Sequence, residues 1–435
     1  MQHIQRNFFT AIFTTYIIFS SSVCIANQDE STLMQTEQHM LMPLWKPANT
    51  STLSIQCTQS TANTEGTYST SDKINYKANN WEQRLPADWA FFDLPKDMGK
   101  VLVIDTQLNN SVPQYRYLSN GTQHDLFEPW SSSKVLAYTG AMASLRDKYD
   151  IGGDGNIGQY NIADLISSIH SYEPHGTANG NSNSIASYFV NLASRDRLNR
   201  LLHKDWLNLS DAHIIFSGAY GADILAPQPH TWHQSSIDNG KALGDLIKNA
   251  DDPGYLPYRC ETCGITGNKA MSTLTLAEWL KRLAMHASDP STVHPYLTEA
   301  DVDVLFHGTG HTNKNDVTAG MMSGISIQLG LAIARSLTQN PTLDANSAEK
   351  VLNQATDGRW RIYQKIGWGP SETRGTGENV MLAHVCLPLN NRKAVFTIAA
   401  QASHPGATEE SVWRSGEKMQ QILDKAMQAL LNKRP

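Results

Sequence analysis

The stretch FEPWSSSKVLAY, residues 127–138, decides how the fold and the chemistry of this chain are interpreted. Three serines precede a lysine, and the apolar run VLAYTGAMASL that follows predicts a helix over residues 132–147. Residues three apart share a helix face, so Ser131 can meet Lys134 directly, whereas Ser132 and Ser133 lack that spacing. The stretch is therefore either a serine cap that starts a helix or a nucleophile followed by its base.

Taken alone, the S-x-x-K spacing favours the helix cap, because it often occurs by chance. A serine at the start of a helix can also act as a nucleophile, since free N–H groups and the positive helix end favour developing negative charge. Lys134 becomes a useful base only if burial or a second cation lowers its pKa. The sequence further along the chain has to decide between the two interpretations.

The order of the downstream segments supplies that context. A predicted hairpin (VLVIDTQLNN and YRYLSNG) precedes the serines, and the helical patterns IADLISSI, GNSNSIASYFVNL and STLTLAEWLKRL follow them. Three strand-like runs and an amphipathic closing helix end the chain. Strands at both ends with helices between them predict an α+β fold. In this order of parts, residues 100–430 resemble the serine β-lactamase and penicillin-binding-protein superfamily, and within it the class A β-lactamase-like branch.

The resemblance implies a β-lactamase/DD-peptidase-like fold, with an antiparallel sheet formed by the N- and C-terminal segments and an all-helical middle region. It assigns Ser131 as nucleophile and Lys134 as its base. The family's second motif, S-x-N, falls in GNSNSIASYFV, where Ser182-Asn183-Ser184 and Asn181-Ser182-Asn183 are both possible registers. Ser182 would relay a proton and Asn183 would contact substrate.

The third motif of the family, Lys-Thr-Gly on an edge strand, reads Lys365-Ile366-Gly367 here. By resemblance, Lys365 anchors a substrate carboxylate and lowers the pKa of the other lysine, and Gly367 lets the substrate approach the strand. The backbone N–H groups of Ser131 and Trp368 would form the oxyanion hole. Ile366 lacks the usual hydroxyl, and we interpret Arg374 on the following turn as an exposed charge.

The implied activity is that of an exported serine acyl hydrolase, which forms an acyl-enzyme with a β-lactam or a related cyclic or peptide amide. The E-x-x-L-N deacylation pattern of class A enzymes is absent, and no glutamate lies between Ser182 and Cys260. Glu261 is the first one, and we interpret it as a surface carboxylate. The alternatives are a D-Ala-D-Ala carboxypeptidase of the same mechanism and a catalytically lapsed member that binds cell-wall fragments.

The N-terminus has the pattern of a signal peptide. An apolar run, FFTAIFTTYIIF, ends in small residues, which predicts a signal peptide over 1–26, a polar and partly disordered segment over 27–95, and the hydrolase domain over 96–435. We therefore expect a periplasmic or secreted protein without a stable membrane span after cleavage. Among the remaining cysteines, Cys260 and Cys263 favour a local disulfide.

Composition and decoy motifs exclude other classes of protein. A formal net charge of −6 without a long basic run argues against a nucleic-acid binder. DIGGDGNIGQYN lacks key calcium ligands, and HGTGH places His307 and His311 four apart without the helix and glutamate of a zinc peptidase. We expect a monomer that acts on a small β-lactam or a peptidoglycan peptide, without metal or cofactor.

Overall fold

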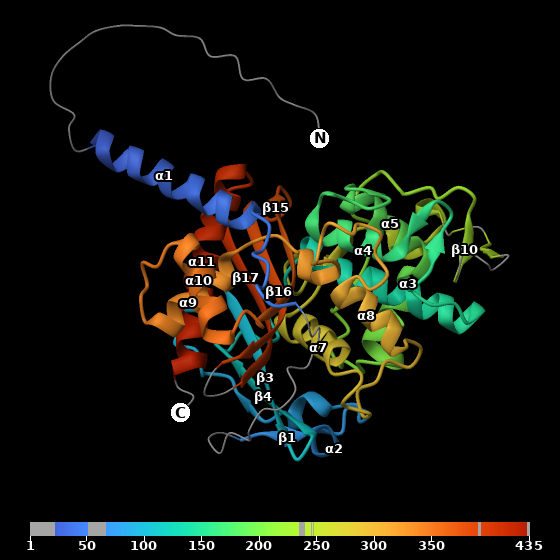
Figure 1. Cartoon of the computed structure of the whole chain (residues 1–435), viewed down its shortest axis with the longest axis horizontal. Coiled ribbons are helices and arrows are strands. Elements are labelled where there is room, and N and C mark those ends of the chain that lie inside the picture. The colour runs from blue at the N-terminus through green and yellow to red at the C-terminus, as the bar shows by residue number, and fades with distance from the viewer. Residues whose placement is uncertain are drawn as a thin grey trace, which may run out of the picture.

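The computed structural model describes residues 22–50, 67–234, 240–244, 246, 248–389 and 393–432. One seven-stranded sheet runs through the molecule in the order β1-β4-β3-β17-β16-β15, with β2 paired in parallel to β4 and all other neighbours antiparallel (Figure 1). Strands from both ends of the chain meet where β3 pairs with β17. The predicted α+β organisation is confirmed. The strands are β1 (Ser69–Thr70), β2 (Ala87–Asp88), β3 (Lys100–Asn109), β4 (Val112–Ser119), β15 (Arg361–Ser371), β16 (Thr376–Pro388) and β17 (Lys393–Pro405).

Both faces of this sheet are covered, which explains why its long strands β3, β15, β16 and β17 are almost continuously buried. Side chains alternate along β3, so that Leu102 and Ile104 pack with the helical region while Val101 and Val103 pack on the opposite face. Figure 1 shows α9, α10 and α11 together on that opposite side of the sheet. These helices are α9 (Gln328–Thr338), α10 (Ala345–Thr356) and α11 (Glu409–Asn432).

The helical region predicted for the middle of the chain lies on the other side of the sheet, with α7 in contact with β3, β16 and β17 (Figure 1). In α3, every residue from Lys134 to Leu145 is buried, as expected of a helix that is covered all round. The helices of this region are α3 (Lys134–Tyr149), α4 (Ile162–Ser171), α5 (Ser182–Ala193), α6 (Arg195–Arg200), α7 (Thr273–Ala284) and α8 (Glu299–His307).

Short elements fill the connections, and most of them lie between α6 and α7. The short strands are β5 (Asn156–Ile157), β6 (Tyr160–Asn161), β7 (Pro174–His175), β8 (Ala178–Asn179), β9 (Ile215–Phe216), β10 (Thr231–His233), β11 (Lys241–Ala242), β12 (Tyr258–Cys260), β13 (Ile265–Gly267) and β14 (Lys269–Ala270). The 3₁₀ and π turns are η1 (Trp81–Arg84), η2 (Trp130–Ser133), η3 (Leu201–Asp205), η4 (Asn249–Asp251), η5 (Pro253–Tyr255) and η6 (Gly320–Ser323).

Described parts of the polar segment 27–95 contribute side chains to the core of the molecule. Within α2 (Ser71–Ile74) and η1, Ile74 and Trp81 are fully buried in the core of the helical region. Upstream, α1 (Ser22–Leu41) projects from the body in Figure 1 and passes the expected cleavage position, and its C-terminal end contacts α11. Residues 1–21 of the expected signal peptide lie outside the described residues. Across the described chain, no helix combines the length and apolarity needed to cross a membrane.

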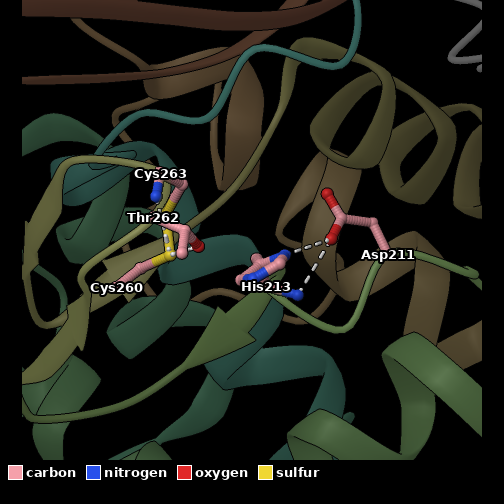
Figure 2. Close-up of a disulfide and its surroundings, with 5 residues drawn as sticks. All are labelled: Asp211, His213, Cys260, Thr262 and Cys263. Carbon is pink, nitrogen blue, oxygen red and sulfur yellow. Dashed lines mark hydrogen bonds and ion pairs between the residues drawn. A yellow bond between two sulfur atoms is a disulfide. The ribbon is translucent and has the colours of Figure 1, made fainter.

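The expected local disulfide is present between Cys260 and Cys263, at the end of β12 (Figure 2). The bridge closes the turn that joins β12 to β13, and the Cys263 N–H points at the Cys260 sulfur at 3.1 Å. Cys57 lies outside the described residues. The Cys260–Cys263 bridge is therefore a local staple of a loop hairpin, and the bonded cysteines are not free thiols for redox or zinc chemistry.

Candidate active site

The turn that carries Ser131 is held by the other two serines. The hydroxyl of Ser132 donates to the Pro129 carbonyl at 2.6 Å, and that of Ser133 donates to the Trp130 carbonyl at 2.7 Å. Trp130, immediately before Ser131, adopts a left-handed backbone with φ of +50°. Such a conformation is costly for a non-glycine residue and is common at functional sites. Ser131 is therefore the serine whose hydroxyl is not used to build the turn, and it lines a cavity.

Lys134 is buried beside the second motif, as a general base requires. Its exposed fraction is 1%, and its Nζ donates to Ser182 Oγ at 2.9 Å and to Asn183 Oδ1 at 2.6 Å. Burial, followed by the nearby charge of Lys269, holds the pKa of Lys134 well below its ordinary value of 10.5. The expected direct contact is not formed, because no hydrogen bond joins Lys134 to Ser131 among the described residues.

The loop before α5 shows which residues of the second motif face Lys134. Asn181 caps the helix, since its side chain accepts from the Ser184 N–H at 3.0 Å. Ser182 Oγ donates to the Ile169 carbonyl at 2.8 Å, which fixes it as an acceptor for Lys134. Ser182 and Asn183, neighbours in sequence, are thus the two residues that face the lysine, while Asn181 and Ser184 are structural.

Gly367 explains how β15 reaches the nucleophile. A Cβ atom at this position would lie 2.6 Å from the Ser131 backbone nitrogen and 2.8 Å from that of Ser132. Only a residue without a side chain lets the strand approach the turn so closely. Trp368, the next residue, lines the same cavity as Ser131. The backbone segments proposed for the oxyanion hole are therefore brought together.

Lys365 does not lie where the resemblance predicted. It is only 1% exposed and does not line the cavity, and its Nζ lies 3.7 Å from the centre of the Tyr172 ring. Within the described part of the chain, this nitrogen has no hydrogen-bond partner. Burial and the charge of Lys134 lower its pKa well below the ordinary value. Lys365 is thus covered by the Tyr172 ring and lies outside the cavity lining.

Tyr172 is a site residue that the sequence did not reveal. It follows the last turn of α4 in a left-handed conformation, with φ of +60°. Its hydroxyl lies beside the side chain of Ser131 and donates to the Ile366 carbonyl at 3.3 Å. Burial raises its pKa, so the phenol stays protonated at neutral pH. Tyr172 is therefore a neighbour of the candidate nucleophile.

The cavity in front of Ser131 has a volume of about 740 Å³, enough for a drug-sized ligand. Lys269, also missed from the sequence, contributes a buried cation that lies 4.2 Å from the Tyr220 ring centre. Burial lowers the pKa of Lys269 to about 8, and the charge of Glu128 opposes that change. The lining includes Glu128, Trp130, Ser131, Asn183, Ala219, Tyr220, Asn268, Lys269, Trp368, Glu372 and Arg374.

Two carboxylates line this cavity in the described chain, Glu128 and Glu372, and neither has the expected sequence position. Glu128 is buried and accepts from the Asn268 N–H at 3.0 Å. Burial raises its pKa. Glu261 is exposed and does not line the cavity, in agreement with its interpretation as a surface carboxylate.

Arg374 is not the exposed charge that we expected. Its side chain is 12% exposed and forms a two-pronged ion pair with Glu378, with both nitrogen–oxygen distances at 2.8 Å. Glu378 also accepts from Trp130 Nε1 at 2.6 Å. The positive charge of Arg374 is therefore compensated, and its pair ties the β15–β16 turn to the residue before Ser131.

Comparisons with known proteins yield only distant structural neighbours. No protein-family model matches the chain, and no curated protein matches its sequence. A structure described as PBP-A is 12% identical, covering 77% of this chain and 90% of that one, with a TM-score of 0.38. A class A β-lactamase from Mycobacterium abscessus is 11% identical (76% and 94%, TM-score 0.39), and a β-lactamase from Xanthomonas campestris is 12% identical (76% and 91%, TM-score 0.40). The assignment of chemistry below rests on the geometry of the site.

Proposed function

We propose that this chain is an exported serine acyl hydrolase of the β-lactamase-like type, which forms an acyl-enzyme at Ser131 with a β-lactam or a related amide. One arrangement carries the proposal: Ser131 lines a cavity while Lys134, buried behind it, bonds to both Ser182 and Asn183. A buried lysine without a carboxylate partner is an expensive feature for a purely structural role. As a neutral amine, it can accept a proton.

The reaction begins with attack of Ser131 Oγ on the lactam or amide carbonyl. Its proton passes to the neutral Lys134 amine once substrate binding brings the two groups together, since catalytic hydrogen bonds often tighten only when substrate binds. The backbone N–H groups of Ser131 and Trp368 stabilise the oxyanion, a contribution of about 10²–10³ in rate for each such donor. Ser182 then protonates the leaving nitrogen and regains its proton from Lys134.

Release of the acyl group separates the β-lactamase from the carboxypeptidase alternative. Glu128 is the buried carboxylate of the cavity, but backbone N–H groups of Asn268 and Lys269 bond to it. Although burial raises the pKa of Glu128, these donors and the Arg374 guanidinium, 3.7 Å away, compete with a water molecule for its oxygen atoms, so we expect slow deacylation. This expectation favours a penicillin-binding peptidase as the second candidate function.

The test is labelling of the purified chain with a fluorescent penicillin, followed over time by intact-mass measurement. We expect one adduct per molecule in the wild type and in Ser210→Ala, and none in Ser131→Ala. Ser210 is exposed and does not line the cavity, so it is the control, and circular dichroism confirms that both variants fold. A persistent adduct supports the peptidase, and a transient one with product release supports the β-lactamase. An unlabelled wild type would overturn both enzyme hypotheses and leave the lapsed binding protein.

A further inference from the structure

Away from the cavity, Asp164, His175 and His311 meet from three separate segments. Asp164 lies in the first turn of α4, His175 in strand β7, and His311 in the loop after α8. One ligand atom of each lies within 4.8 Å of the others, and this is the one group of three or more His, Cys, Asp or Glu residues with such geometry in the described chain. None of the three lines the cavity that contains Ser131.

The two imidazoles carry buried nitrogen atoms that lack partners. His175 is 4% exposed, and neither of its ring nitrogens has a hydrogen-bond partner among the described residues. Its Nδ1 lies 3.6 Å from Asp164 Oδ1, which is too long for a hydrogen bond. The buried Nδ1 of His311 is unpartnered in the same sense. Such unsatisfied buried groups are rare in native proteins and point to a bound partner such as an ion.

Asp164 is prepared as an ionised ligand. Its carboxylate accepts from the backbone N–H groups of Thr177 at 2.7 Å and Thr312 at 2.8 Å, and from the hydroxyls of the same two threonines at 3.0 Å and 2.5 Å. These four donors favour the ionised carboxylate over the neutral acid. Hydrogen bonds of this kind orient the carboxylate ligands of metal ions.

We propose that Asp164, His175 and His311 bind one divalent transition-metal ion, with Zn²⁺ as the best fit. Two imidazoles and one carboxylate form a common zinc ligand set, which leaves a fourth position for water. At tetrahedral angles, two atoms that share a zinc ion at about 2.0–2.2 Å lie about 3.3–3.6 Å apart. The three ligand atoms lie within 4.8 Å of one another, so they have to approach by up to about 1.5 Å when the ion binds.

The ion would cross-link segments that lead to the catalytic residues, whichever reaction those residues perform. It would join the loop after α8 to α4 and to the β7–β8 hairpin, which leads directly to Ser182. The opposite end of α4 carries Tyr172. In the HGTGH motif only His311 takes part, because His307 bonds instead to Asp303 at 2.6 Å and to the Tyr363 hydroxyl at 2.9 Å. The expectation that the chain binds no metal is thus replaced by this proposal.

The experiment measures zinc binding to the full chain after it has been stripped with a chelator. Equilibrium dialysis with elemental analysis should find one Zn²⁺ per wild-type chain, and His175→Ala or His311→Ala should weaken binding at least about tenfold. The matched control is His213→Ala, because His213 forms an exposed pair with Asp211 at 3.0 Å (Figure 2). This control should retain wild-type affinity.

A second measurement separates lost binding from lost folding. Zn²⁺ should raise the Tm of the wild type and of His213→Ala, while His175→Gln, which keeps a polar side chain, should fold but show no such rise. Absence of stoichiometric zinc in the wild type would overturn the proposal. Unchanged affinity in both His175→Ala and His311→Ala would do the same. A Tm that depends on pH but not on zinc would identify His175 and Asp164 as an ion pair only, and would also overturn it.

Discussion

Two clusters of buried lysine in this molecule have opposite designs. In α7, Lys281 lies 2.9 Å from a Glu278 carboxylate oxygen and donates to the Tyr76 hydroxyl at 2.9 Å, so its charge is compensated. At the candidate active site, Lys134 donates to two neutral oxygen atoms and lies near the Tyr172 and Tyr220 rings, and Lys365 lies on the Tyr172 ring. A paired buried lysine holds elements together, whereas an unpaired one loses its proton readily. The comparison distinguishes a structural cation from a chemical base.

The largest expected effect is on chemistry at the unpaired site. Lys134→Met should slow acylation by about 10²–10⁴-fold, the usual contribution of a positioned base, with only a small change in the free energy of unfolding. The rate constant for labelling by fluorescent penicillin measures the effect. Lys281→Met is the matched control: it removes an equally buried lysine and should leave the labelling rate of the folded protein unchanged. If Lys134→Met were labelled at the wild-type rate, the two lysine clusters would not differ as a chemical base and a structural cation.

The next effect is on stability at the paired site. Glu278 accepts from Lys281 and Arg282 through one oxygen and from the Tyr117 hydroxyl through the other. Glu278→Gln leaves two buried cations without a counter-charge, which should lower the free energy of unfolding by about 3–5 kcal/mol. Urea denaturation followed by tryptophan fluorescence measures the change. The control is Glu410→Gln, whose exposed pair with Arg414 contributes less than about 1 kcal/mol. If Glu278→Gln and Glu410→Gln were equally stable, the buried Glu278 cluster would not be the stabilising ion pair that we infer.

The third prediction concerns Gly367, where the backbone of β15 lies close to the turn that carries Ser131. A Cβ on Gly367 would collide with the Ser131 nitrogen, so Gly367→Ala must push β15 away from the turn. A shift of this size should slow acylation by about 10²-fold, because reacting groups lose their alignment, and should destabilise by about 1–3 kcal/mol. At Gly244 an added Cβ meets nothing within 4 Å, so Gly244→Ala is the control. Equal labelling rates for the two variants would argue against a role for this strand.

Whether the sequence predicted a feature or missed it depends on how far apart along the chain the interacting residues lie. The apolar strands β3, β15, β16 and β17 and the helix after Ser131 were predicted because local periodicity specifies them. Alternation along β15 also places Lys365 and Gly367 on one face. The ring that covers Lys365 was missed, since Tyr172 comes from the end of another helix and has no pattern of its own.

The remaining misses have the same cause. Lys269 enters the cavity from a two-residue strand within a long loop region that shows no periodicity. The three candidate zinc ligands are separated by 11 and 136 positions along the chain, as their residue numbers 164, 175 and 311 show. No local spacing connects them, and only the packing of α4 with the loop after α8 brings them together. Residues that act across such separations become visible only in the folded chain.

The smallest expected effect concerns the pH dependence of the unpaired lysine. The charge of Lys269 is a cause of the low pKa of Lys134, second to burial. Acylation requires the neutral amine, so its rate should rise with pH through that pKa. Lys269→Met removes the charge and raises the pKa of Lys134, which moves the rising limb to higher pH and slows labelling at neutral pH. Lys241→Met, at an exposed lysine, should leave the limb in place.

The same variant should change the pH dependence of stability in a defined direction. Lys269 has a pKa of about 8 in the folded chain against an ordinary value of 10.5. Between these values the unfolded state binds more protons, so wild-type stability rises as the pH increases from about 8 to 10.5. Lys269→Met removes this slope and should stabilise the protein below pH 8, where the buried charge is present. If urea denaturation across this range gives the same slope for both proteins, burial of the Lys269 charge costs no stability. The effect of Lys269 on the pKa of Lys134 would then have to come from direct contact and not from its charge.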